Sequence, residues 1–244
     1  MRKITLISIL MVGYSLTIQQ LVAQNIRGGF GHGAFGPVYN ISPSIINDLK
    51  DPFLLGNDIK LNGLAMLGGG GGYGLLKNNI LIGGSGFGYK IADATSRGQA
   101  TFSIGGGFVN LGYLVIAKRS MIAYPYIGIG ATGMNLKLKN NTSGESFNLG
   151  SAAIAPGQRK NFNCGGMGFE IGYAVKLLTF SIDEVGPHGG FMVGLQAGTY
   201  FFSGVDDWYE EKTDDVISTF SRPNAFSPYL RITIGGGGFN VSGN

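Results

Sequence analysis

The sequence is poor in cysteine, histidine, proline and charge. It has one Cys, two His and eight Pro among 244 residues, and 13% of the residues are charged. A single Cys excludes an internal disulfide framework and a Cys-rich zinc or iron–sulfur site. The low Pro content, without a Gly repeat at every third residue, excludes a collagen-like chain. The formal net charge of +4 does not predict a concentrated basic surface, so we expect no nucleic-acid partner.

Glycine, in contrast, is abundant. The chain has 44 Gly residues, which is well above a typical usage of about 7%. Each Gly in a helix costs about 1 kcal/mol relative to Ala, which disfavours a mainly helical fold. Hydrophobic residues still make up 44% of the sequence, and this argues against a disordered low-complexity chain.

The N-terminus has the organisation of a secretory signal peptide. Arg2 and Lys3 precede an uncharged, mainly apolar run over residues 4–18, and the small residue Ala23 lies beyond its end. The run is shorter than the about 20 apolar residues that a membrane helix needs. We therefore predict a Sec signal peptide over residues 1–23, followed by one domain over residues 24–244. A retained N-terminal anchor is the alternative.

Two-residue alternation dominates the rest of the chain. Residues 167–177 and 226–235 each have one apolar face and one face of Gly, Tyr and single polar groups. Side chains of a strand point alternately to its two faces, so both segments predict strands. They are longer than the usual 5–6 residues, and their second face lacks the Lys and Glu of a solvated surface. Both features favour membrane strands over a soluble sandwich.

The connections alternate in length. We predict eight strands, over residues 26–39, 59–76, 80–91, 99–117, 121–138, 161–180, 189–203 and 225–239. The connections 40–58, 139–160 and 204–224 are long, and the others are short. This is typical of an all-β fold with a single eight-stranded antiparallel up-and-down transmembrane β-barrel, with the long loops outside and both termini in the periplasm. The apolar phase shifts between residues 102–104 and 109–115, so we also expect a bulge near residues 105–107.

Two segments carry a resemblance to a known family. Residues 124–130 and 227–235 share a Pro-Tyr dipeptide followed by apolar residues and Gly, and they resemble strands of OmpA/OmpX-type outer-membrane barrels. Thr233, Gly235 and Phe239 are similar to the C-terminal sorting signal of those proteins, although residues 240–244 follow the aromatic. The resemblance implies an outer-membrane location, contact with outer-membrane lipid and lipopolysaccharide, and delivery by the barrel-assembly machinery. We expect no peptidoglycan-binding domain after the barrel.

The polar residues on the predicted inner face are candidate lumen residues. A lone charge enclosed there would be costly, so we predict that Glu170 pairs with Arg231, with Lys176 as a second partner. The alternative is that Glu170 meets trapped water and Tyr hydroxyls. The full set of candidate lumen residues is Glu170, Lys176, Gln196, Arg231, Tyr126 and Tyr229.

Aromatic residues near the strand ends match the girdles that such barrels place at the headgroup level. The candidates are Tyr73, Tyr89, Tyr200, Phe201, Phe226 and Phe239.

No chemical motif predicts an enzyme, a cofactor or a metal site. Residues 128–133 match the dinucleotide pattern G-x-G-x-x-G, but the alternation continues through them and no helix opens at their end. His32 and His188 have no nucleophile motif nearby, and we interpret both as structural. Cys164 is predicted to be a small inward-facing filler.

The acidic loop 204–224 is read as a solvated surface. Calcium binding by its carboxylates is an alternative, and Trp208 and Tyr209 leave adhesion open. The first long loop, 40–58, is apolar enough to fold back on the rim. The leading functional hypothesis is a structural or surface-interaction barrel that acts through its long loops on an extracellular ligand. A narrow porin-like channel is the first alternative, and a secreted soluble Gly-rich β protein is the second.

Overall fold

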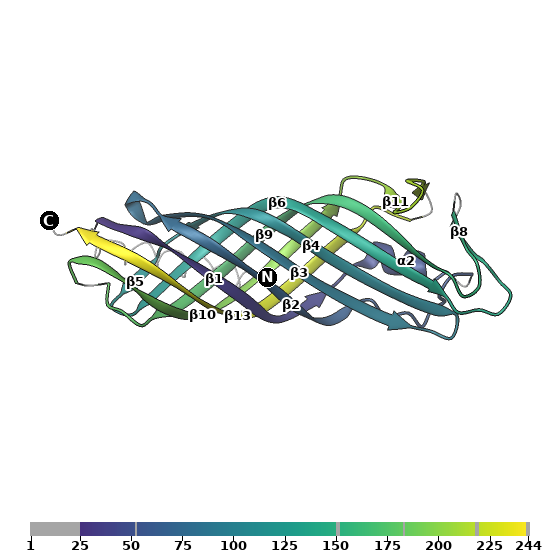
Figure 1. Ribbon diagram of the computed structural model, residues 1–244, viewed down its shortest axis with the longest axis horizontal. Helices are drawn as coiled ribbons and strands as arrows, with labels where there is room; N and C mark the ends of the chain where they lie inside the picture. The colour runs from purple at the N-terminus through teal and green to yellow at the C-terminus, as the bar shows by residue number, and fades with distance from the viewer. Residues whose placement is uncertain (1–24, 52, 150–151, 183, 218–219, 243–244) are drawn as a thin grey trace, which may run out of the picture.

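The computed structural model describes residues 25–51, 53–149, 152–182, 184–217 and 220–242, so the predicted signal peptide 1–23 lies outside the described residues. Within them, eight long strands form a single wall (Figure 1). They are β1 (Asn25–Asn40), β2 (Gly63–Leu75), β3 (Ile80–Ala94), β4 (Gly98–Tyr113), β6 (Met121–Asn140), β9 (Arg159–Leu178), β10 (Gly186–Gly204) and β13 (Asn224–Ser242).

The wall closes on itself. Each long strand pairs antiparallel with its neighbours, and the first and last strands, β1 and β13, pair through a register that includes Phe30 opposite Gly237. Closure leaves no unpaired edge among the eight long strands, which is what a sheet surrounded by lipid requires. The predicted eight-stranded antiparallel barrel is confirmed.

The two ends of the barrel differ. The end that we call the turn end carries the short connections, with η2 (Lys77–Asn79) and β5 (Ile116–Lys118). The opposite end, the loop end, carries α2 (Pro43–Leu49), β7 (Phe147–Leu149), β8 (Ala152–Ile154), β11 (Trp208–Glu210) and β12 (Val216–Ile217) (Figure 1). No helix among the described residues is long and apolar enough to cross a membrane. Residues 95–97 make the β3–β4 connection tighter than the predicted 92–98.

The expected bulge near residues 105–107 is wrong. The β4–β6 register runs without interruption from Ile104 opposite Met134 to Val109 opposite Ile129. The apolar residues change face instead: Phe102 and Ile104 are buried inside the barrel, whereas Val109 and Leu111 are exposed on its outer surface. Side chains of β4 alternate between the inside and the outside of the barrel along its whole length. The apolar residues lie on the inner face near the loop end and on the outer face farther along the strand.

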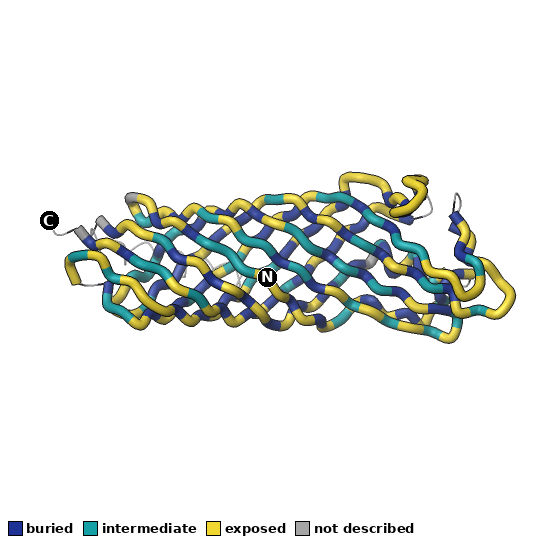
Figure 2. Tube along the Cα trace, viewed as in Figure 1, coloured by how far each residue is buried: buried dark blue, intermediate teal, exposed yellow. Residues whose placement is uncertain are grey.

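An apolar belt surrounds the barrel. Buried and exposed residues alternate along the long strands (Figure 2), and large hydrophobic residues are among the exposed ones on every long strand. Its members include Phe35, Leu64, Met66, Ile82, Val109, Leu111, Ile127, Ile129, Phe169, Ile171, Phe191, Val193, Leu195, Leu230, Ile232 and Ile234.

The predicted aromatic girdles hold only in part. Phe201 and Phe226 are exposed on the outer surface and their rings lie 5.2 Å apart. The other four predicted members, Tyr73, Tyr89, Tyr200 and Phe239, are buried inside. The prediction was wrong for these four because aromatic rings also fill the narrow lumen.

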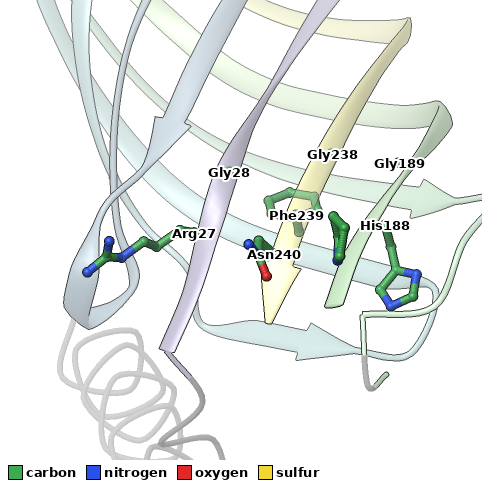
Figure 3. A pocket seen from close by; sticks show the side chains of 8 residues that line it. Arg27, Gly28, His188, Gly189, Gly238, Phe239 and Asn240 are labelled. Atoms are coloured by element: carbon green, nitrogen blue, oxygen red, sulfur yellow. The ribbon is translucent and has the colours of Figure 1, made fainter. Parts of the chain in front are cut away.

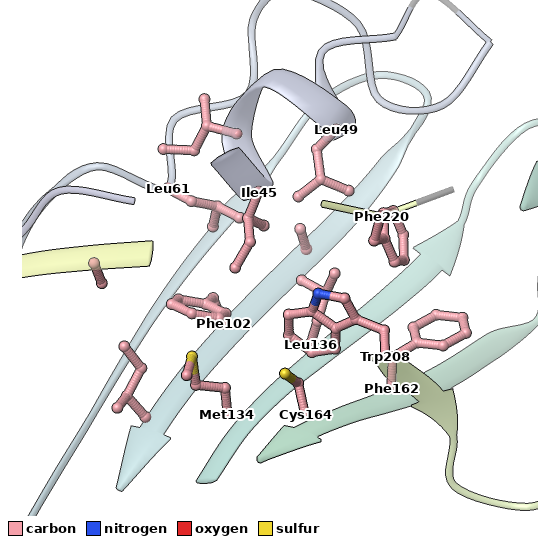
Figure 4. Close-up of a cluster of buried hydrophobic side chains, with 14 of the residues drawn as sticks. Ile45, Leu49, Leu61, Phe102, Met134, Leu136, Phe162, Cys164, Trp208 and Phe220 are labelled. Carbon is pink, nitrogen blue, oxygen red and sulfur yellow. The ribbon is translucent and has the colours of Figure 1, made fainter. Parts of the chain in front are cut away.

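Two hydrophobic clusters fill the ends of the lumen. The loop-end cluster joins Ile45 and Leu49 of α2 to Phe102, Phe162 and Trp208 (Figure 4). The turn-end cluster includes Phe30, Tyr73, Leu81, Tyr124, Leu178 and Phe239. The apolar first loop therefore folds onto the rim, as predicted, and its helix contributes to the packed core.

The outer belt generates a test of membrane contact. We expect Ile171→Lys to lower the free energy of unfolding by about 2–4 kcal/mol, because it places a charge in the middle of the lipid-facing belt. Ser203→Lys, on the same outer surface near the loop end and with the uncharged cross-strand partners Asn224 and Met167, is the control and should cost about 0–1 kcal/mol. Urea unfolding in lipid vesicles measures both. Equal losses would mean that the belt does not face lipid.

Candidate functional site: polar lumen and loop-end cap

Glu170 and Arg231 meet inside the barrel, between the two hydrophobic clusters. They lie on β9 and β13, one on each side of β10, and each is 2% exposed. Arg231 Nη2 donates to Glu170 Oε1 at 3.1 Å. The strand register explains the meeting, since Tyr200 and Gln196 of β10 are the partners of Glu170 and Arg231 respectively.

Tyrosine hydroxyls complete this ion pair. Tyr229 donates to Glu170 Oε1 at 2.6 Å, and the hydroxyls of Tyr229 and Tyr126 are 2.7 Å apart. Arg231 donates to Tyr200 at 2.7 Å, and through Nε to Gln196 Oε1 at 2.8 Å. The ion pair and the Tyr contacts, which the sequence left as alternatives, therefore occur together. Bonds to charged groups in a site without bulk water are stronger than neutral ones, so this network resists rearrangement.

Lys176 is buried nearby but has another partner. Its Nζ donates to Thr233 Oγ1 at 3.1 Å and lies 5.1 Å from the centre of the Phe30 ring. The structure thus places Lys176 beside a hydroxyl and an aromatic face, on the turn-end side of the network, and not against Glu170 as expected.

Two further polar residues extend the network, and the sequence reasoning missed them. Asn110 Nδ2 donates to Tyr73 OH and to Ser85 Oγ, both at 2.8 Å, and Ser85 reaches Glu170 Oε2 at 3.4 Å. The available signal was weak, because Ser85 is a single polar residue within a Gly-rich strand. Its inward position follows only once the phase of β3 is known.

Glycine makes room for these rings. A Cβ on Gly172 would lie 2.7 Å from the Tyr126 ring, and one on Gly198 would lie 2.6 Å from Tyr229 OH. Gly on the inner wall is therefore a steric requirement of the Tyr–Glu–Arg network. Four buried polar atoms in this layer have no hydrogen-bond partner within the described residues, namely His32 Nδ1, Asn110 Oδ1, Tyr124 OH and Gln196 Nε2. Buried polar atoms of this kind are ordinarily met by trapped water.

The long loops form a tied cap over the loop end. Asp48 of α2 accepts from the backbone N of Ser221 at 2.7 Å and from its hydroxyl at 3.1 Å, which joins loop 40–58 to loop 204–224. Arg97 donates to Leu54 O at 3.1 Å and pairs with Glu145 at 2.8 Å. Because these bonds cross from loop to loop, the cap is a connected structure.

Trp208 belongs to this cap. The side chain is fully buried and its Nε1 donates to Ser221 O at 3.1 Å, so the idea of Trp208 as an adhesive surface residue is wrong. Tyr209, by contrast, is 38% exposed. Cys164 is buried, with its thiol 3.2 Å from Asp206 O.

The acidic residues of loop 204–224 pair with neighbours. Glu210 accepts from Lys160 at 2.6 Å, Glu211 from Asn161 at 2.7 Å and Asp207 from Arg222 at 3.1 Å. Across the part of the chain that the structure describes, no three His, Cys, Asp or Glu side chains gather as a metal site.

The two histidines lie at different levels of the barrel. His32 stacks on Tyr73 in the lumen, with ring centres 6.2 Å apart. His188 lies 3.9 Å from Glu184 at the turn end. There it flanks a hollow of about 430 Å³ with Arg27 on the other side and Phe239 between them (Figure 3).

No family model and no curated protein matches the chain. Among solved structures, Ail of Yersinia pestis in complex with the heparin analogue sucrose octasulfate is similar at 8% identity and a TM-score of 0.47, over 86% of this chain and 98% of that one. Neisserial surface protein A aligns at 11% identity and a TM-score of 0.41, over 84% of this chain and 96% of that one. The outer membrane protein OprG of Pseudomonas aeruginosa aligns at 12% identity and a TM-score of 0.36, over 88% of this chain and 97% of that one. Sucrose octasulfate is the ligand bound in that structure of Ail.

The buried ion pair generates a double-mutant test. We expect Glu170→Gln to lower the free energy of unfolding by about 3–5 kcal/mol, because it leaves Arg231 buried without a counter-charge. Adding Arg231→Met should recover part of the loss, since the unpaired charge is then gone. Urea unfolding followed through the fluorescence of Trp208, the single Trp of the sequence, reports the cycle.

Glu145→Gln is the matched control, because it makes the same chemical change in an ion pair whose carboxylate is 68% exposed. That substitution should cost about 1 kcal/mol or less. Strict additivity of the two lumen substitutions would contradict a coupled pair.

Proposed function

We propose that this protein is an outer-membrane β-barrel with a structural or surface-interaction role, carried out by the surface of its loop end. The observation that carries the proposal is the filled lumen. A polar layer centred on Glu170 and Arg231 lies between two hydrophobic clusters, and α2 and Trp208 pack over the loop end. Interaction is therefore left to the outer surfaces.

The outer belt supports the membrane location. Side chains such as Ile127, Phe169, Leu195 and Ile232 are 40–60% exposed and point away from the barrel axis. A soluble protein rarely exposes apolar surface that surrounds it completely, whereas lipid contact makes such surface favourable. The belt therefore favours the membrane barrel over the secreted soluble alternative. Contact with outer-membrane lipid and lipopolysaccharide, and delivery by the barrel-assembly machinery, belong to the same proposal.

The packed ends weigh against the porin-like alternative. Phe102, Leu136 and Phe162 are fully buried at the loop end, and Leu81 and Tyr124 are fully buried at the turn end. A solute would have to displace both clusters and break the Glu170–Arg231 network. His32 is buried within the same packed lumen, so we propose a role without catalysis.

The cap provides a surface for an extracellular ligand. Phe53 is 78% exposed beside Asp48, Lys50 and Asp51, and these residues line an open hollow of about 480 Å³ next to Asn148. Across the cap, Val205, Tyr209 and Val216 are also exposed. Exposed aromatic and aliphatic side chains with polar neighbours are the composition of recognition surfaces. We place ligand contact on this face.

Topology can be tested with epitope tags. A tag inserted after Lys212 should bind antibody on intact cells, because the loop end is proposed to face the exterior. The control is the same tag after Asn78 in the short β2–β3 turn, which should become reachable only after the outer membrane is broken. Reversed accessibility of the two tags would overturn the proposed orientation.

Conductance separates the first two functional classes. The purified barrel in a planar bilayer should give no stable unitary current steps, because both ends of the lumen are packed. Compact migration in cold SDS and slower or faster migration after boiling should show that the same sample is a folded barrel. Reproducible steps from that folded sample would favour the porin-like alternative.

A further inference from the structure

The outer surface of four neighbouring strands changes from apolar to polar at one level. Cross-strand pairing places Ser103 of β4 opposite Asn135 of β6, and Asn135 opposite Asn163 of β9. Asn135 Nδ2 donates to Asn163 Oδ1 at 2.7 Å. Lys90 of β3 is the remaining member of this row, opposite Ser103. The row marks the edge of the apolar belt, and the strands continue beyond it toward the loop end.

Beyond this row the outer surface is basic. Lys137 lies between Thr101 and Asn161 in the register, and Lys139 lies between Gln99 and Arg159. We call Gln99, Thr101, Lys137, Lys139 and Arg159 the basic face. Its members line a hollow of about 180 Å³. Their chain neighbours Leu138, Leu136 and Ala100 are fully buried, so the strands hold the charged side chains outside the barrel.

The arrangement of charges in the basic face lowers the stability of the sheet. Lys139 and Arg159 are direct cross-strand partners, and like charges placed directly opposite each other destabilise a sheet. The nearby acids have other contacts: Glu210 pairs with Lys160, and Glu145 pairs with Arg97. Glu211 accepts from Asn161, the residue next to Lys137 in the register. Asp206 lies over Gly165, which is closer to the apolar belt than the basic face is. An anion in the hollow would relieve the repulsion.

A track of Gly residues and one Ala runs up to the basic face from the belt. The outward row directly below Ser103 and Asn135 is Gly105 opposite Gly133, and the next is Gly107 opposite Ala131. A Cβ on Gly133 would meet nothing within 4 Å, and one on Gly105 would make only an ordinary contact at 3.5 Å. Local packing therefore does not explain these Gly residues. A smooth surface of this kind lets acyl chains lie close to the backbone.

We propose that the basic face and the Gly track together bind a phosphorylated glycolipid of the outer leaflet. Lys137, Lys139 and Arg159 hold its headgroup phosphate, Gln99 and Thr101 donate to its sugar oxygens, and its acyl chains lie along Gly105, Gly107 and Gly133. Charge-assisted bonds to phosphate are the strong class of hydrogen bond, and Arg offers two parallel donors. The site rests on the outer-membrane location proposed above, with the loop end outside.

The test compares two triple variants of the full chain in non-ionic detergent. Lys137→Gln, Lys139→Gln and Arg159→Gln together remove the cations of the basic face. Lys60→Gln, Lys118→Gln and Lys212→Gln together remove the same charge from exposed positions elsewhere. The probe is purified lipid A carrying its phosphates, beside enzymatically dephosphorylated lipid A and heparin.

The basic-face variant should bind phosphorylated lipid A about tenfold or more weakly, because it loses the charge-assisted contacts. The control variant should stay within about twofold of the unmodified chain, since isolated exposed charges contribute little. The unmodified chain should prefer phosphorylated over dephosphorylated lipid A. Equal binding by the basic-face variant, or indifference to the phosphates, would overturn the proposal. So would a basic face that binds only heparin, because the ligand would then be a soluble sulfated polymer.

Cold-SDS mobility of each variant separates this site from the function on which it rests. Compact mobility with unchanged lipid A binding in the basic-face variant would refute the glycolipid site and leave the membrane barrel standing. A mobility that does not respond to heating in the unmodified chain would refute the membrane barrel itself.

Discussion

Backbone pairing in lipid is the constraint on which the rest of this structure depends. A sheet surrounded by hydrocarbon must pair its N–H and C=O groups within itself, and β1 meets that need by pairing with β13. Closing eight strands leaves a lumen that only side chains can fill. The consequences reach individual residues. The rings of Tyr126 and Tyr229 require Gly172 and Gly198, their cross-strand partners on the neighbouring strands, and a buried Glu170 requires Arg231.

The filling is layered. Apolar clusters occupy both ends of the lumen, and the charged layer lies between them, away from bulk water. An enclosed carboxylate is costly unless its lone pairs are met, and Glu170 is met by Arg231, Tyr229, Tyr126 and Ser85. Such a network specifies the relative register of β9, β10 and β13, because a slip by one residue would turn its members to the lipid. Closure and register therefore support each other.

Much of the wall and of the lumen could be predicted from the sequence, because a period of two is visible without a structure. That period gave the eight strands and the inward face of Glu170 and Arg231. The long-range partners could not be read in the same way: Lys176 meets Thr233 and Phe30, since which side chains meet depends on strand stagger. The burial of Trp208 and the tie from Asp48 to Ser221 were also hidden. Both depend on loops from distant parts of the chain folding together.

The one misread strand, β4, shows what the alternation encodes. Its apolar residues change face between Ile104 and Val109 because the solvent outside changes from water to lipid, while the inside stays packed throughout. The same change occurs on β6, where Ile129 points outward and Leu136 inward. A change of apolar face within an unbroken register therefore marks the depth at which a strand leaves the membrane. Beyond that depth the barrel resembles a soluble protein, because its interior is packed and its outer surface is polar. Helix α2 belongs to this packed interior. The strands of the barrel therefore extend beyond the membrane and support the cap, so we expect the surface of the cap to be as rigid as the strands.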